Sequence, residues 1–260
     1  MKKILLAAAL FAALPCLAAQ DFSKADAAFS NGEYAECRAE LEALKPQAQK
    51  GAELAGVLWR LSRLELVLGE KETTRDGKRA VFGRGRDYAE AAIKQDPSDP
   101  NGYMWHSANV GRECQTHGLK DQAAAVPVMM KDLEKILCEL GYAEFSEAWQ
   151  ALAEIYYNHP FKSTDSAINF ARRAAMTIPA GEKRSETLIF LAEVLESRGW
   201  SAEKRAASAS KSVADTSDNI EKYSRLDALL GKDYRPLWAS KPLGAMSDKE
   251  EAAALRAFAR

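Results

Sequence analysis

The sequence predicts an all-α protein made of successive antiparallel helical hairpins. Apolar residues recur at three- and four-residue spacing along almost the whole chain, which is the period of an amphipathic helix. Ala, Leu, Glu, Lys and Arg dominate, and these are strong helix formers. Signals for strands are scarce: Asn31-Gly32 could form a tight turn, but Ala-rich helical patterns flank it on both sides. At 47% hydrophobic and 28% charged residues, the chain has the composition of a folded globular protein.

The first element in chain order is a predicted signal peptide over residues 1–19. Two lysines precede an apolar run at 4–14, Pro15 ends that run, and cleavage after Ala18 or Ala19 would leave a small residue at the new end. No later segment approaches 18 uninterrupted apolar residues, so no transmembrane segment is expected in the mature chain. We therefore expect export to the periplasm.

The four cysteines raise three separate questions. Cys16 follows the apolar run and could instead be the lipidated first residue of a lipoprotein, but Pro15 stands where such sites require a small residue. The remaining three allow one bridge in an oxidising compartment, and Cys114 and Cys138 are the candidate pair because they flank a predicted insertion. Cys37 lies at a predicted close-packing position, where an unpaired thiol acts as a small buried hydrophobe.

Residues 20–235 are expected to form one helical repeat domain. Small residues stand where the two helices of each hairpin would approach most closely, and large ones, Tyr103 and Leu188, would fill the gaps between hairpins. The small residues are Ala25, Gly85, Ser107, Ala153, Ala167 and Ala192. The turns that end first helices are expected at Gly32, Gly69 and Gly199, and the ends of second helices at Pro97 and Pro179.

These offsets resemble the tetratricopeptide (TPR) repeat, in which a unit of roughly 34 residues folds as two antiparallel helices. The resemblance implies an α-solenoid, here irregular and with insertions. A basic loop is expected at 70–86, and an inserted helix is expected around Val128 to Leu140. A further helix is expected near Ile220 to Leu230.

Residues 236–260 are expected to form an extended segment and a last helix. Ser247 and Glu250 have the spacing of a capping box at the start of that helix. The sequence leaves open whether this segment, which contains WASKPLG, would fill the binding groove as an internal ligand.

The layout also resembles exported bacterial proteins related to the regulators of microtubule dynamics, and TatT-like proteins associated with TRAP transporters. The shared features are a repeat array with insertions and the loop HPFKST before an Ala-rich helix. Members of these groups are scaffolds or ligand-handling partners without shared catalytic residues. The resemblance therefore implies no enzyme activity and no cofactor.

A TPR-like array would present its first helices along a concave groove. Aromatic and arginine side chains on such a surface are the types that dominate binding hot spots. By register, the groove residues are predicted to be Trp59, Arg63, Met104, Arg112, Gln150, Glu154 and Tyr157. Trp59 and Met104 could equally be buried between units.

Other candidate chemistry is sparse. Glu113, Cys114 and His117 could hold part of a metal or thiol site, but an ion pair on a helix end explains them as well, and HExxH is absent. The basic residues between Arg75 and Arg86 could bind an anion or a partner, or form a solvated connector. We found no GxSxG elbow, P-loop or GxGxxG motif.

Three functions remain open at this point. The leading hypothesis is a periplasmic binding or scaffold protein that recognises a protein or peptide through its groove. The second is a partner of a TRAP-type transporter that handles a small apolar ligand, and the third is a hydrolase or metalloenzyme using Glu113, Cys114 and His117. With 36 basic and 37 acidic residues, the chain lacks the basic excess of a nucleic-acid-binding protein.

Overall fold

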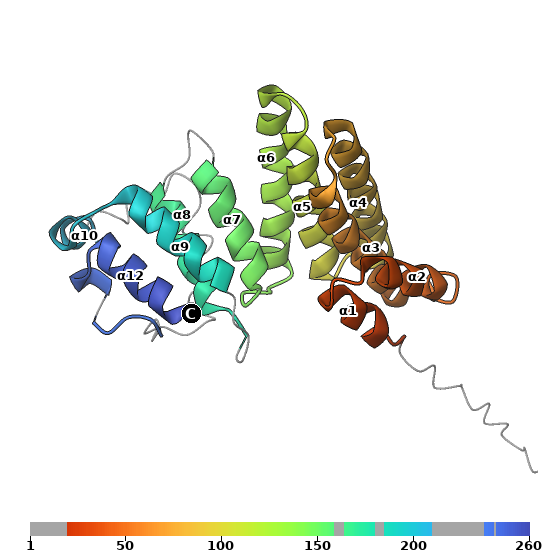
Figure 1. Ribbon diagram of the computed structural model, residues 1–260, viewed down its shortest axis with the longest axis horizontal. Coiled ribbons are helices and arrows are strands. Elements are labelled where there is room, and N and C mark those ends of the chain that lie inside the picture. Colours follow the sequence, from red (N-terminus) through yellow and green to blue (C-terminus); the bar gives the residue numbers. More distant parts are fainter. Residues whose placement is uncertain (1–19, 159–163, 180–184, 210–236, 242) are drawn as a thin grey trace, which may run out of the picture.

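A computed structural model gives the fold of the chain (Figure 1). It describes residues 20–158, 164–179, 185–209, 237–241 and 243–260. The predicted signal peptide, most of the HPFKST loop and the predicted helix near 220–230 lie outside these ranges. The part of the chain that is described contains helices and turns but no strand, which confirms the all-α prediction.

The helices follow one another as antiparallel pairs along the long axis of the molecule, from α1 and α2 at one end to α10 and α12 at the other (Figure 1). The first four pairs are α1 (Ser23–Ser30) with α2 (Tyr34–Leu44), α3 (Ala52–Lys71) with α4 (Arg75–Gln95), α5 (Pro100–Gln115) with α6 (Leu119–Glu134), and α7 (Ser146–Asn158) with α8 (Thr164–Met176). Each pair also contacts the next, and α3 contacts α5 as α5 contacts α7. This arrangement is an irregular TPR-like α-solenoid.

The fifth pair departs from chain order. The partner of α9 (Ser185–Arg198) is α12 (Asp248–Phe258), whereas the helix that directly follows, α10 (Ala202–Ala209), contacts the short 3-10 turn η3 (Leu243–Ala245). The C-terminal helix therefore completes the last hairpin and extends the array by packing on its end. The predicted capping box is present at its start, where Ser247 and Glu250 bond each other's backbone N–H groups.

The turns follow the predicted chemistry at two of the three glycines. Gly32 and Gly199 adopt φ of 78° and 66°, values that L side chains rarely reach, directly after α1 and α9. Gly69 does not end a helix, because α3 continues to Lys71. Its role is close packing: a Cβ at Gly69 would lie 2.3 Å from the Cε1 atom of Phe82 on α4.

The basic loop predicted at 70–86 is wrong. Only three residues separate α3 from α4, and the side chain of Thr74 caps α4 by accepting from the backbone N–H of Gly77. Val81 and Phe82 are buried at 6% and 2% exposure, so the basic residues alternate with an apolar face that packs on α3. The many charged residues hid the helical spacing of the apolar positions in this segment. Packing of those apolar positions on α3 stabilises the helix.

The separate inserted helix predicted around Val128 to Leu140 is also wrong. The helix α6 begins at Leu119, contacts α5 and is continued by a π-helical turn, η1 (Lys135–Glu139). It is therefore the second helix of the third hairpin. In its final turns Leu133, Ile136 and Leu137 are fully buried, which ties it to the following pair.

The core forms two clusters. The N-terminal cluster gathers buried residues of α1, α2 and α3, including Cys37. The larger cluster runs from α5 to α12 around Trp149, Tyr156 and Phe170, and it includes Met104. The predicted small residues are all buried, which confirms them as positions of close helix approach. No helix among the described residues is long and apolar enough to cross a membrane.

Candidate functional site: the first-helix face

The exposed side of the first helices of the pairs is the candidate binding surface, and we call it the first-helix face. Of the seven residues predicted there, six are at least partly exposed on α3, α5 and α7. Met104 is the exception: of the two placements that the sequence left open, the structure shows burial between units and not the groove. It is 9% exposed and packs in the larger core cluster, because an unbranched apolar side chain fills the space between α5 and the next hairpin.

The N-terminal part of the face is an ion-pair cluster between α1 and α3. Asp26 accepts hydrogen bonds from Arg60 at 2.9 Å and from Arg63 at 2.7 Å. Although burial opposes it, these bonds and charges lower the pKa of the Asp26 carboxyl. The Arg60 guanidinium lies 4.1 Å from the centre of the Trp59 ring, and that of Arg63 lies 3.9 Å from Phe29. Arg60 and Arg63 therefore fix α3 against α1, and the Trp59 ring packs beside both guanidinium groups.

The central part of the face joins α3 to α5. Arg112 is 45% exposed and its Nε atom lies 2.7 Å from Glu70. Trp105 stands seven residues earlier on α5, which is close to two helical turns, and it is partly exposed. Its indole N–H has no acceptor among the described residues. Sequence reasoning missed Trp105, although its spacing from Arg112 was a usable signal.

The C-terminal part of the face joins α7 to α9. The Gln150 side chain accepts a hydrogen bond from Thr187 and donates one of 3.1 Å to Glu154. Tyr157 is 36% exposed and meets Phe190 edge-on, with 5.9 Å between ring centres. The sequence pattern of α9 indicated only which of its positions are buried, so it did not identify Phe190 as a surface residue.

The structure thus distributes the six surface residues over three contacts between neighbouring first helices. Trp59 and Arg63 lie together, Arg112 lies one helix further on, and Gln150, Glu154 and Tyr157 lie together. The arrangement can recognise an extended partner at several points. It does not converge on one atom, as a catalytic site would require.

The residues proposed for a metal or thiol site have separate partners. Glu113 binds Arg86 of α4 at 2.5 Å, and the Cys114 thiol donates to the carbonyl of Gly111 at 3.0 Å. Burial raises the pKa of the Cys114 thiol, which disfavours the thiolate that a nucleophile or ligand requires. His117 faces Asp121 at 4.0 Å. Across the described ranges no group of three or more His, Cys, Asp or Glu could hold a metal ion.

The predicted bridge between Cys114 and Cys138 is not formed in the structure, where both residues are thiols. Cys114 lies on α5 and Cys138 in η1, two elements that contact each other. Cys37 is fully buried in the N-terminal core cluster, at the close-packing position that the sequence indicated.

The four arginines of α4 are engaged within the protein. Arg75 and Arg79 both donate to the carbonyl of Thr116, which caps the negative end of α5. Arg84 binds Glu65 at 3.1 Å, and Glu65 is fully buried. These contacts stabilise the pairing of α3, α4 and α5, so the basic run serves packing between helices.

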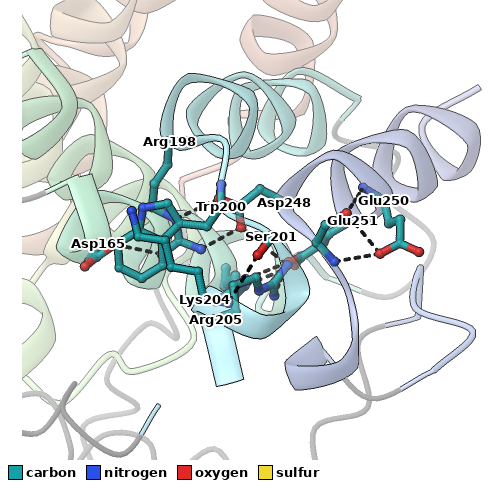
Figure 2. A network of polar contacts seen from close by, with 11 residues as sticks. Asp165, Arg198, Trp200, Ser201, Lys204, Arg205, Asp248, Glu250 and Glu251 are labelled. Carbon is teal, nitrogen blue, oxygen red and sulfur yellow. Dashed lines mark hydrogen bonds and ion pairs between the residues drawn. The ribbon is translucent and has the colours of Figure 1, made fainter. Parts of the chain in front are cut away.

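A second polar cluster anchors the C-terminal helix (Figure 2). Asp248 accepts bonds of 2.7 and 2.8 Å from Arg198, and Glu251 accepts bonds of 2.7 Å from Arg205 and 2.6 Å from Arg172. Both carboxylates are fully buried. Although burial opposes it, hydrogen bonds and the nearby guanidinium charges lower the pKa values of both carboxyls. Every charge in this cluster has a partner inside the protein, so the cluster is an internal clamp.

Comparison with known proteins supports the fold. The family model described as regulator of microtubule dynamics protein 1-3 matches residues 21–137. The solved structure of a thermophilic TPR protein from Thermus thermophilus aligns with a TM-score of 0.53 and 17% identity, covering 79% of this chain and 95% of that one. No curated protein matches the sequence. The predicted TPR-like fold is confirmed, whereas the likeness to TatT-like proteins and the export of the chain stay predictions.

Proposed function

We propose that this TPR-like protein is a periplasmic scaffold that binds a polypeptide partner through its first-helix face and catalyses no reaction. One observation carries the proposal: aromatic and arginine side chains remain partly exposed at successive contacts along that face, and these are the types enriched in binding hot spots. The lysines, apolar run and small residues at 1–19 support export.

The packing supports recognition by a preformed surface. Several exposed side chains on the face are also held by a neighbouring first helix, as Arg112 is by Glu70 and Tyr157 is by Phe190. Side chains that are already ordered lose less conformational entropy when a partner binds. A stacked helical array of this kind offers an extended interface, which suits a polypeptide better than a small solute.

The test is photo-crosslinking in the periplasm of cells that produce the full chain. A photoreactive phenylalanine derivative replaces Arg112 or Tyr157 on the first-helix face, or Lys94, which is exposed on the second helix α4. We expect the same crosslinked polypeptide from both face positions and none from Lys94. Equal crosslinking from all three positions, or none from the two face positions, would contradict the proposal.

Native mass spectrometry of the purified mature chain separates the alternatives. A stoichiometric small apolar molecule that co-purifies, in the absence of any crosslinked polypeptide, would favour ligand handling over scaffolding. Detection of the chain in the cytoplasmic fraction with residues 1–19 still attached would contradict export.

A further inference from the structure

The surface between α7 and α9 combines exposed apolar side chains with exposed carboxylates. Tyr157 and Ile189 are each 36% exposed, and Phe190, next to Ile189 on α9, contacts the Tyr157 ring. Large apolar side chains gathered in this way on one face are typical of interaction sites. We call these three residues together the α7–α9 seam.

Carboxylates border the α7–α9 seam on both sides. Glu154 lies on α7 one turn before Tyr157, and Glu186 and Glu193 lie on α9 seven residues apart. Seven residues are close to two helical turns, so Glu186 and Glu193 project from the same side of α9, with Phe190 one turn from each. Glu186 and Glu193 are exposed and Glu154 is partly exposed.

No basic side chain of these two helices balances that charge. Within their described residues, α7 contains no Lys or Arg, and α9 contains only Arg198. Arg198 is 11% exposed and is bound to Asp165 of α8 and Asp248 of α12. Arg256 of α12 is bound to Glu196 at 2.8 Å, and its pKa is raised by that bond and also by the charge of Glu193, whereas no described base forms an ion pair with Glu154 or Glu186.

We propose that the α7–α9 seam docks a basic segment of a partner polypeptide, with an apolar side chain seated against Tyr157, Phe190 and Ile189 and with Lys or Arg side chains paired to Glu154, Glu186 and Glu193. The charge complementarity selects this occupant, because an acidic peptide or a nucleic acid would be repelled by the same carboxylates. This inference rests on the proposed scaffold function and names the chemistry of its partner at one site.

The test uses the full mature chain and a fluorescent lysine-rich peptide that carries one phenylalanine and one leucine. Binding is followed by fluorescence anisotropy at low and at physiological salt. Two matched peptides replace the lysines by glutamates or the two apolar residues by serines. The face variant carries Glu154→Gln, Glu186→Gln and Glu193→Gln.

A second triple variant controls for net charge. It carries Glu36→Gln, Glu42→Gln and Glu72→Gln, which neutralise three exposed carboxylates on α2 and after α3. We expect the face variant to weaken binding of the lysine-rich peptide about tenfold, the effect of three exposed ion pairs of ordinary strength. The control triple should change binding less than about twofold, and Tyr157→Ala should weaken it several-fold without lowering the melting temperature appreciably.

The possible outcomes distinguish failure of the basic-partner inference from failure of the proposed scaffold function. Equal or tighter binding of the glutamate peptide, or equal weakening by both triple variants, would overturn the inference of a basic partner. If the polypeptide crosslinked at Arg112 and Tyr157 binds the face variant as tightly as the native chain, this inference fails and the scaffold function stands. If neither crosslinking nor peptide binding is observed, both fail.

Discussion

Replacing Glu251 by glutamine should release the C-terminal helix from the end of the array. Glu251 is fully buried and accepts hydrogen bonds from Arg172 and Arg205, at 2.6 and 2.7 Å. Arg205 is itself 7% exposed, so it has little access to water. Glutamine keeps the volume of the side chain but removes the charge that neutralises both guanidinium groups.

The expected cost is about 3 kcal/mol, because removing one member of a buried ion pair leaves an uncompensated buried charge. Burial of Leu255, the one large apolar residue in the buried face of α12, contributes about 1.5–3 kcal/mol. The loss is therefore comparable to the main apolar contribution of this helix. We expect α12 to undock locally while α1 to α8 keep their packing, as a repeat array permits.

Hydrogen exchange of the amides in 248–258, together with urea unfolding, measures this effect. The matched control is Glu196→Gln, which removes another ion pair of α12, that of Arg256 with Glu196 of α9. Because that pair is exposed to solvent, its loss should cost far less than the loss of the buried pair. Adding Arg205→Met to Glu251→Gln should restore part of the protection, since it removes the unpaired charge. Equal loss of protection in Glu251→Gln and Glu196→Gln would refute the argument.

Three further outcomes are expected. Because the pKa values of the two buried carboxyls in the clamp are lowered in the folded chain, the docking of α12 should be independent of pH near neutrality. It should weaken as pH falls below about 5, where the unfolded carboxyls begin to take up protons, and exchange rates in 248–258 across an acid titration would show this. Gly85→Ala should destabilise the fold by about 1–3 kcal/mol in urea unfolding, because the added Cβ would lie 2.2 Å from Oδ1 of Asn109. Gly83→Ala, whose added Cβ would have its nearest contact at 3.4 Å, should be neutral or stabilising. The reverse order of stabilities would contradict the packing of α4 on α5. Burial raises the pKa values of the Cys37 and Cys114 thiols, so in the folded chain at pH 7 both should react with a disulfide reagent much more slowly than in the chain unfolded by urea. Rapid reaction of the folded chain would contradict the burial of these thiols.

The helical pairing could be predicted from the sequence because it depends on local patterns. Small residues such as Ala153 and Ala167 mark close approach, and Gly32 and Gly199 mark turns that need positive φ. The stretch at 70–86 was misplaced for a physical reason. Its helical period is carried by Val81, Phe82 and Gly85, and their packing on neighbouring helices outweighs the charged residues between them.

The first-helix face could be predicted only in part. Register identified Arg112 and Tyr157 as surface residues, but it could not separate Met104 from them, since one helical turn contains both buried and exposed positions. The partners of these side chains come from distant parts of the chain, as when Arg63 binds Asp26. Such contacts depend on how the hairpins stack, which periodicity within one helix does not encode.

The position of α12 explains how the last hairpin of the array is completed. The helix that follows, α10, has only small apolar residues in the sequence AEKRAASA and cannot cover Leu191 and Leu195 of α9. α12 supplies Leu255 for that purpose, and its first turn carries Asp248 and Glu251, where a helix N-terminus favours negative charge. The arginines that meet these carboxylates come from α8, α9 and α10. Arg205 of α10, labelled in Figure 2, thus contributes a charge where an apolar surface would otherwise be expected. The last hairpin is thus closed by electrostatics between segments distant in sequence.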